Sequence, residues 1–210
     1  GSGEVLDILS LPQIGKINFE IDSTEQLIAE QEYLQLPSGY IIQRFAEDPV
    51  EGKGHKLILT FDDGPDPEWT PQILDILEKE KIPASFFVVG INVEKNIPIL
   101  QRINKDGFEI GNHTFTHSNL AKMSLARAEV EMKLTRILIE TFTGKSTILF
   151  RAPYNADSEP QTFDELEPIA RSAKENYLTI GESVDPMDWQ KGVSADSIFA
   201  RVAFQVEDKN

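Results

Sequence analysis

The chain has 210 residues, of which 40% are hydrophobic and 26% charged, a balance typical of a globular domain with a full hydrophobic core. Its formal net charge of −15 argues against nucleic-acid binding, because phosphate recognition needs clustered Lys and Arg, and it disfavours anionic membrane surfaces. The absence of cysteine excludes a disulfide framework, a thiolate metal site and a Cys nucleophile. No apolar run is long enough to span a bilayer, and no signal peptide opens the chain.

The first 55 residues differ in pattern from the rest of the chain. Residues 16–21 and 40–45 alternate between apolar and polar side chains, whereas residues 23–32 between them have a helix-like pattern. Two glycines in residues 52–54 predict a hinge. We therefore expect two parts: a small N-terminal extension or linker of residues 1–55, which packs on the main domain, and that domain, residues 56–210.

The main domain opens with a predicted strand and a helix. Residues 56–61 form a continuous β-rich run without alternation, which predicts a strand buried on both faces. Thr70 and Pro71 predict the N-cap and first residue of a helix that ends before Pro83. The apolar residues expected on the inner face of this helix are Ile73, Leu74, Ile76 and Leu77.

Strands and helices then alternate along the chain. Further strands are predicted at residues 84–89, 108–110, 147–151 and 177–184, and further helices at 97–106, 124–142, 162–175 and 194–206. The helix at 97–106 stops at Gly107, and Thr162 with Glu165 forms a capping box. The longest helix is closed by Gly144, and its predicted inward residues are Val130, Leu134, Ile137 and Leu138. This alternation predicts parallel βαβ units and hence an α/β sheet or barrel.

Histidine is scarce and clustered in this sequence. Two of the three histidines, His113 and His117, are four residues apart, a spacing that can turn two imidazoles toward one metal ion. A carboxylate from another segment would complete a face of two histidines and one aspartate, with positions left open for water or substrate. Taken alone, such a pair is as often two exposed polar residues of a helix as a ligand pair.

Four polar segments each follow a predicted strand: residues 62–63, 113–117, 151–154 and 185–189. Each has an ordinary interpretation on its own, since Asp-Asp-Gly-Pro usually forms a turn and Trp189 would by default be a core aromatic. The carboxyl ends of parallel strands form one rim, however, so the four segments are expected to converge. That convergence is the strongest indication of a functional site.

The same segments resemble the motifs of the NodB-type polysaccharide deacetylases of carbohydrate esterase family 4. Residues 60–65 read TFDDGP, and residues 113–117 give the His-x3-His of the second motif. Residues 151–154 match Arg-x-Pro-Tyr, and residues 185–189 match Asp-x-x-Asp-Trp. The resemblance implies a distorted (β/α) barrel with fewer than eight regular strands.

The resemblance also implies a role for each matching residue. Asp63, His113 and His117 would bind one divalent ion, zinc in the first place, although two imidazoles and a carboxylate also tolerate cobalt, nickel or manganese. Asp62 would be the general base that deprotonates water, and Arg151 would orient it and balance its charge.

The other two motifs would serve the substrate side of the site. Tyr154 would lend its backbone N–H to the oxyanion and would contact substrate. Asp188 and Trp189 would support the wall of the active site, with Trp189 also in contact with substrate.

One family motif has no match in this sequence. The family's late Leu-x-His supplies the histidine that protonates the leaving amine, but no histidine follows His117, and His55 precedes the first barrel strand. We expect that the sequence stops short of the last barrel strand, rather than that the protein uses another proton donor. The open barrel edge would be covered by the N-terminal segment or by a second copy of the chain, and deacetylase activity would be low.

The expected function is metal-dependent removal of N-acetyl groups from N-acetylglucosamine-containing polysaccharide at a bacterial cell surface or on the extracellular side of the membrane. Two alternatives stay open: O-deacetylation of a xylan-like polysaccharide, and a non-catalytic carbohydrate-binding fragment. A weaker resemblance suggests the deacetylase domain of a larger bacterial protein fused to a glycosyltransferase. Membrane association would then come only from parts outside this sequence.

Overall fold

The structure is a computed structural model. It describes residues 5–10, 16–22, 27–35, 40–45, 58–154, 167–168, 171–172, 175–182 and 184–208. Its centre is a parallel sheet of five strands: β5 (Leu59–Gly64), β6 (Ala84–Val88), β7 (Glu109–Asn112), β8 (Leu149–Phe150) and β9 (Leu178–Thr179).

The order of strands in the sheet is the order in the chain, β5-β6-β7-β8-β9. Each crossover therefore steps to the next strand in the same direction, which is the arrangement of a barrel wall rather than of a sheet wound in two directions. Among the described residues β5 and β9 are the two edges of this wall. The predicted α/β class is confirmed, and the open wall is consistent with a distorted barrel that lacks its last strand.

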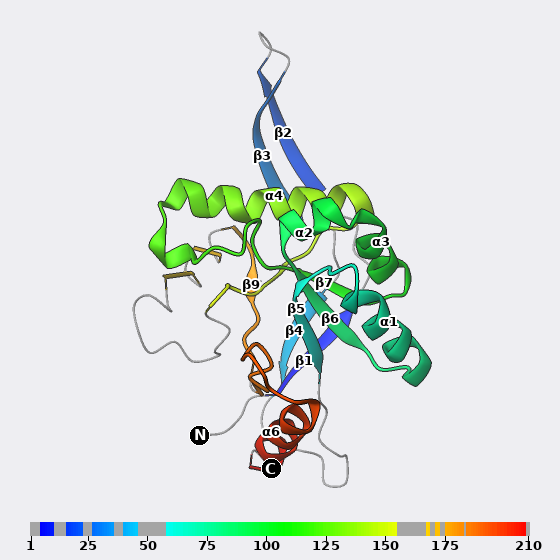
Figure 1. Cartoon of the computed structure of the whole chain (residues 1–210). Coiled ribbons are helices and arrows are strands. Elements are labelled where there is room, and N and C mark those ends of the chain that lie inside the picture. Colours follow the sequence, from blue (N-terminus) through cyan, green and yellow to red (C-terminus); the bar gives the residue numbers. More distant parts are fainter. Residues whose placement is uncertain are drawn as a thin grey trace.

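The helices whose bounds the structure describes are α1 (Trp69–Glu80), α2 (Gly90–Lys95), α3 (Ile97–Lys105), α4 (Leu125–Thr143) and α6 (Ala195–Asp208), with a short 3₁₀ turn at Leu120–Lys122. Residues 167–168 and 171–172, within the helix predicted at 162–175, are also helical. Figure 1 shows α4 crossing over the sheet, with α2, α3 and α1 beside it and α6 at the opposite end of the molecule. The predictions for α3, α4 and α6 are confirmed to within two residues. The short helix α2 was not predicted.

The ends of α4 follow the expected local chemistry. The Ser124 hydroxyl accepts a hydrogen bond from the Arg127 amide, and Gly144 closes the helix with a positive φ of 70°. Serine at the N-cap satisfies a free amide, and glycine adopts the left-handed conformation without steric cost. These two residues explain why both ends of this helix could be predicted from the sequence.

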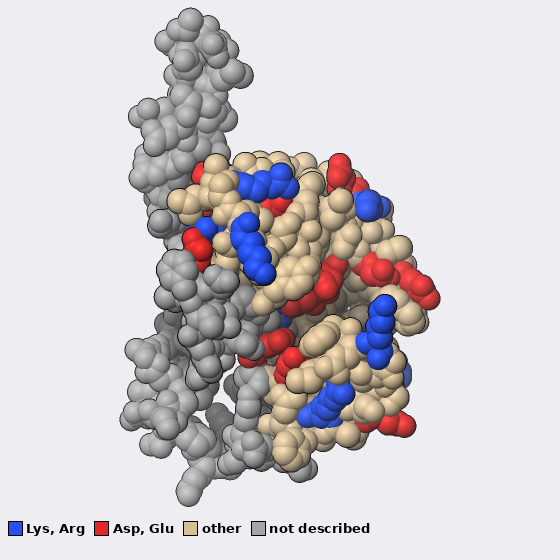
Figure 2. Space-filling model, turned by 60° about the vertical axis from the view of Figure 1, so that its left-hand side comes forward, with Lys and Arg blue, Asp and Glu red and all other residues tan. Residues whose placement is uncertain are grey.

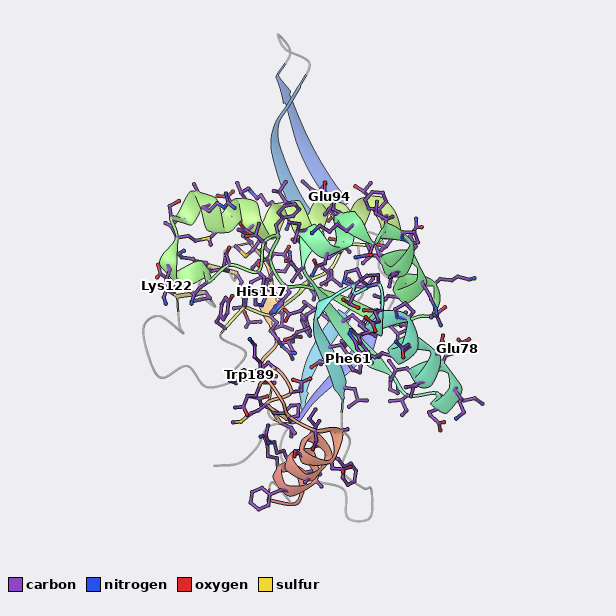
Figure 3. All side chains as sticks on the ribbon, viewed as in Figure 1. Phe61, Glu78, Glu94, His117, Lys122 and Trp189 are labelled. Carbon is purple, nitrogen blue, oxygen red and sulfur yellow. The ribbon has the colours of Figure 1, made fainter. Side chains whose placement is uncertain are left out.

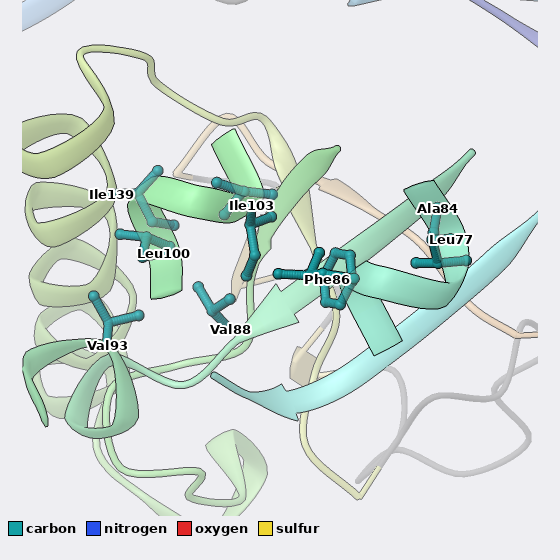
Figure 4. Packing of buried hydrophobic residues seen from close by; sticks show 10 residues of the cluster. Leu77, Ala84, Phe86, Val88, Val93, Leu100, Ile103 and Ile139 are labelled. Carbon is teal, nitrogen blue, oxygen red and sulfur yellow. The ribbon is translucent and has the colours of Figure 1, made fainter. Parts of the chain in front are cut away.

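The main core lies between the sheet and α1, α3 and α4. Figure 4 shows its buried side chains meeting in one cluster of Leu74, Leu77, Ala84, Phe86, Val88, Val93, Leu100, Ile103, Ile110 and Ile139. A second cluster joins Leu120, Ala128, Met132, Phe150, Ala152 and Tyr177. The two clusters together fix α4 against the ends of β7 and β8, where the polar segments begin.

The first strand and helix of the sheet differ in detail from the prediction. Ile58 is exposed and β5 is only partly buried, because β5 is an edge strand. Helix α1 begins at Trp69, before the predicted N-cap, because the Asp66 carboxylate accepts the Trp69 amide. Ile76, predicted to face inward, is exposed.

The inward face of α4 was predicted wrongly. Val130, Leu134 and Ile137 are exposed, although Leu138 packs against the core as expected. The face that packs consists of Ala128, Glu131, Met132, Thr135 and Ile139. Apolar residues occupy both faces of this helix. The face that carries Glu131 and Thr135 can be buried because loop amides donate to the Glu131 carboxylate and the Thr135 hydroxyl donates to the Glu131 carbonyl within the helix.

The N-terminal part contains four strands, β1 (Val5–Ser10), β2 (Lys16–Asp22), β3 (Leu27–Gln35) and β4 (Tyr40–Phe45). β1 pairs with β4 and β2 with β3, both antiparallel, and Figure 1 shows β2 and β3 projecting as a ribbon. The helix predicted over residues 23–32 is therefore wrong for residues 27–32, which form strand.

Some predictions fall on residues that the structure does not describe. These are the hinge at residues 52–54 and the capping box of Thr162 and Glu165. The division into residues 1–55 and 56–210 stays a prediction. Among the described residues, no helix has both the length and the apolar character needed to cross a membrane.

Candidate metal centre and active site

The carboxyl-terminal end of β5 presents two adjacent aspartates, Asp62 and Asp63, in different directions. Asp63 adopts a left-handed conformation with φ of 65°, so the chain turns sharply between the two side chains. The turn is held by α2: the Asn92 side chain donates to the Asp63 carbonyl at 2.7 Å, and the Val89 amide donates to the Gly64 carbonyl at 2.9 Å.

The two histidines lie on the loop after β7. Two left-handed residues, Thr114 with φ of 67° and His117 with φ of 55°, shape this loop. Ligand atoms of Asp63, His113 and His117 all lie within 4.8 Å of one another. In the view of Figure 3, His117 lies between α4 and the loop that carries Trp189.

The geometry of the three side chains suits a divalent ion. The Asp63 Oδ1 atom is 3.0 Å from His117 Nε2 and 3.4 Å from His113 Nε2. Ligands that bind one ion at about 2.0–2.2 Å lie roughly 3 Å apart. His113 Nδ1 is 2.7 Å from the Arg151 carbonyl, which can only accept, so Nδ1 carries a hydrogen and Nε2 is the atom that a neutral ring would offer to an ion. We identify the three residues as a candidate metal site.

The same geometry affects the ionisation of Asp63. Hydrogen bonds from His113 and His117 hold the pKa of the Asp63 carboxyl well below its ordinary value, against an opposing effect of burial. An ionised carboxylate beside two imidazoles is the form that a cation requires.

Arg151 joins three strands beneath the site. Its side chain is 2% exposed, and its guanidinium donates to Asp62 Oδ1 at 2.8 Å and to Thr60 Oγ1 at 2.8 Å on β5. The same group donates to the carbonyls of Ile180 and Gly181 after β9, at 3.0 and 3.2 Å. Asp62 is thereby fixed beside the metal site, with its Oδ2 4.0 Å from His113 Nε2.

Two aromatic side chains are much more open. Tyr154 is 72% exposed, has φ of 61°, and places its ring 4.8 Å from the ring of His117. Trp189 is 73% exposed, and no hydrogen bond or ion pair joins the nearby Asp188 to any other described residue. The structure thus brings Tyr154 to the metal site and places Asp188 and Trp189 on an exposed loop.

Comparison with known proteins decides the family. Residues 50–167, more than half of the chain, match the family of polysaccharide deacetylases. This chain belongs to that family. All three candidate metal ligands, Asp62 and Arg151 lie within the matched residues.

Two bacterial relatives of this family member are named as deacetylases, one of peptidoglycan and one of chitooligosaccharides. A peptidoglycan-N-acetylglucosamine deacetylase from Bacillus cereus is 35% identical over 183 residues, which cover 79% of this chain and 64% of the relative. A chitooligosaccharide deacetylase from Sinorhizobium fredii is 34% identical over 161 residues, which cover 73% of this chain and 71% of the relative.

A solved structure shows the same fold. Peptidoglycan deacetylase PdaC from Bacillus subtilis matches with a TM-score of 0.62 at 36% identity, over 71% of this chain and 69% of that chain. The chain thus spans only about two thirds of the length of these proteins. None of the three names mentions a glycosyltransferase, so the fusion stays a prediction.

Several residues that support the site in this deacetylase-family chain were not found from the sequence. Asn112, fully buried, accepts from the Thr114 amide and donates to the Met132 carbonyl and the Tyr177 hydroxyl. Burial raises the pKa of Tyr177 to about 12, so its hydroxyl stays protonated. Glu131 accepts bonds from the loop that carries the histidines. Asn112 directly precedes His113, the only sequence signal that could have indicated it.

Proposed function

We propose that this protein removes N-acetyl groups from N-acetylglucosamine-containing polysaccharide, with zinc held by Asp63, His113 and His117. The observation that carries the proposal is the meeting of these three ligand atoms beside Asp62, which Arg151 holds in place. The named relatives, which act on peptidoglycan and on chitooligosaccharides, support the choice of substrate.

Hydrolysis of an acetamide needs help at two places, because an amide carbonyl is a poor electrophile and water is a poor nucleophile. A divalent ion, when bound, acts as a Lewis acid and lowers the pKa of water toward about 7. Asp62 is the group that takes the proton from the attacking water, and Arg151 keeps its carboxylate oriented for that task. Cobalt, nickel and manganese are the other ions that this set of ligands accepts.

We assign the binding of substrate to the exposed aromatic residues Tyr154 and Trp189. The Tyr154 backbone N–H donates to the developing oxyanion, an interaction typically worth a few kcal/mol. The Tyr154 and Trp189 side chains provide apolar faces for sugar rings, and Asp188 belongs to the same wall. A polysaccharide of this kind places the protein at a bacterial cell surface. The open edge of the barrel wall pairs with the N-terminal segment or with a second copy of the chain.

The charge distribution agrees with a neutral glycan rather than a polyanion. In Figure 2, Lys and Arg side chains are scattered among acidic and neutral ones on the described surface of that face. With the net charge of −15, this surface offers no electrostatic attraction for nucleic acid.

The test measures zinc binding and acetate release together. We expect the chain to bind one zinc ion. We also expect it to release acetate from chitooligosaccharides slowly, but faster than the Asp62→Asn variant does. Release is slow because no histidine follows His117 to protonate the amine. Rapid turnover would show that a late histidine is dispensable.

Three other outcomes would contradict the proposal. Faster release from acetylxylan than from chitooligosaccharides would favour an ester substrate. Equal, background release by the zinc-loaded chain and by Asp62→Asn would favour a non-catalytic carbohydrate-binding domain. A failure to bind zinc would remove the basis of the mechanism.

A further inference from the structure

A single carboxylate on α4 connects that helix with the loop of the two histidines. Glu131 is 1% exposed, although it is charged and lies in the middle of a helix. A buried carboxylate is costly unless donors surround it. In this structure five donor groups point at its two oxygens.

Three of the five donors belong to the loop. The amides of Phe115 and Thr116 donate to Glu131 Oε2 at 3.1 and 2.7 Å, and the Thr116 hydroxyl donates to Oε1 at 2.8 Å. The other two donors are Nε and Nη2 of Arg127, one helical turn earlier, at 3.0 and 2.7 Å from Oε1. One oxygen therefore holds the loop backbone, while the other is shared between the loop and the guanidinium.

The loop needs such a restraint because its backbone is strained. Thr114 and His117, which bracket the two bonded amides, are both in the left-handed region that non-glycine residues rarely adopt. Strained conformations of this kind persist only where the surroundings hold them. Without the bonds at residues 115 and 116, the loop would relax and His117 would move away from Asp63.

The opposite side of the loop is held by the start of α2. The amides of Gly90 and Ile91 donate to the carbonyls of Thr114 and Phe115, each at 2.9 Å. A side chain at residue 90 would meet the Phe115 ring at 2.3 Å, so only glycine allows this approach. The loop is thus clamped between the backbone of α2 and the carboxylate of Glu131.

We propose that Glu131 is a positioning residue, which holds the loop of residues 113–117 so that both imidazoles reach the same ion. This inference rests on the metal site proposed above. The two proposals can be tested separately, because the hydrogen bonds to Glu131 come from Phe115, Thr116 and Arg127 and involve none of the three proposed ligand side chains. Burial raises the pKa of Glu131, but the bonds from Thr116 and Arg127 outweigh burial and leave its pKa below the ordinary value. The residue therefore acts as an ionised acceptor.

The alternative is that Glu131 only stabilises the fold. The two roles predict different results for the Glu131→Gln variant, whose amide group would face Arg127 and the Thr116 hydroxyl. Glu129→Gln is a matched control, since Glu129 lies on the same helix, pairs with Lys133 one turn later, and is half-exposed. Each variant replaces one carboxylate of α4 with an amide, but only Glu131→Gln changes a side chain that contacts the loop.

Two quantities are measured on the folded chain: zinc affinity by competition with a chromophoric chelator, and amide hydrogen exchange of Phe115 and Thr116 in metal-free protein. In Glu131→Gln we expect zinc affinity to fall roughly ten- to hundredfold, and the two amides to exchange at least about tenfold faster. Glu129→Gln should match the wild type in both. Thr116→Val, which removes one of the three loop bonds, should weaken zinc binding several-fold.

Unchanged zinc affinity in Glu131→Gln would overturn the proposal, whatever happens to its melting temperature. If that variant does not fold, Thr116→Val decides, and wild-type affinity in it would also overturn the proposal. If the wild-type chain binds no zinc, the proposed function fails separately. The exchange rates of the two amides then decide whether Glu131 holds the loop.

Discussion

Two halves of the site differ sharply in how the protein holds them. The braced half consists of residues 62–65, the loop of residues 113–117, and Arg151, and hydrogen bonds from or to Asn92, Glu131 and Arg151 hold it in place. The open half consists of Tyr154 and residues 187–189, whose side chains are exposed. In the mechanism proposed above, the catalytic groups are therefore organised before substrate arrives, whereas the substrate contacts form on binding.

Backbone strain is concentrated at the site. Seven described non-glycine residues have positive φ, and five of them lie there: Asp63, Thr114 and His117 in the braced half, and Tyr154 and Met187 in the open half. Strain of this kind costs stability and is retained where it places a functional group. In the braced half, hydrogen bonds with Gly90 and Asn92 of α2 and with Glu131 of α4 offset it.

The largest expected effect separates the two aspartates of the braced half. The Asp62→Asn variant should still bind zinc. In a form of the protein that releases acetate, its kcat should be roughly 10²- to 10⁴-fold lower than that of the wild type, because the general base is lost. Asp63→Asn should instead lose zinc affinity, because a ligand is lost. Zinc content and kcat are measured for both, and identical behaviour of the two variants would contradict the division of roles.

Removal of Arg151 should break the braced half. Arg151→Met leaves Asp62 without its cation and two carbonyls without donors, so we expect the free energy of unfolding to fall by about 3–5 kcal/mol in denaturant titrations. Arg151→Lys should recover little of this loss, since an ammonium cannot reach four acceptors in a plane. A change below about 1 kcal/mol would mean that the brace is unimportant.

Truncation in the open half should affect binding but not stability. Trp189→Ala should change the free energy of unfolding by no more than about 0.5 kcal/mol and raise KM for chitooligosaccharides about five- to tenfold. The control is Phe204→Ala, which removes another exposed aromatic, on α6. Equal KM values for Trp189→Ala and the control would argue against a substrate contact at Trp189.

The smallest effect concerns pH, and its source lies at the far end of β7. Burial raises the pKa of Glu109 to about 7 from an ordinary 4.5, against the opposing charge of Lys145. The folded state therefore holds this proton more tightly than the unfolded state, and stability declines as pH rises from about 4.5 to about 7.

Glu109→Gln should remove this loss. The variant should be more stable than the wild type by roughly 1 kcal/mol at pH 8, after allowance for solvent exposure, and the difference should vanish below pH 4.5. Thermal unfolding across this range measures it. A difference that grew toward low pH would reverse the assigned sign.

The sequence predicted the order of the strands and the meeting of Asp62, Asp63, His113, His117 and Arg151 better than the faces of the helices. The predicted strands at residues 147–151 and 177–184 are shorter in the structure, at Leu149–Phe150 and Leu178–Thr179. Ser124 and Gly144 act through the backbone next to them, so the two ends of α4 could be predicted correctly from the sequence. The inward face of α4 depends on what α4 meets, and the partner of Glu131 is a loop some fifteen residues away, which no periodicity records. Hydrophobic spacing therefore selected Val130 and Ile137, which are exposed.

The candidate site divides in the same way. Asp62, Asp63, His113 and His117 are recognisable from the sequence because they lie in short motifs and are residue types that bind metal ions or accept protons. Asn92 acts through a backbone carbonyl, on a helix too short for its periodicity to be seen. Supporting residues of this kind become visible only when the fold brings them to the loop.

Zinc stoichiometry is the most direct test of the central claim, that Asp63, His113 and His117 form one metal site. Metal content after dialysis against zinc is measured for the wild type and for the His113→Ala/His117→Ala double variant, with circular dichroism to show that both are folded. We predict one zinc per wild-type chain and none in the double variant. Unchanged zinc content in the folded double variant would contradict the site and the mechanism built on it.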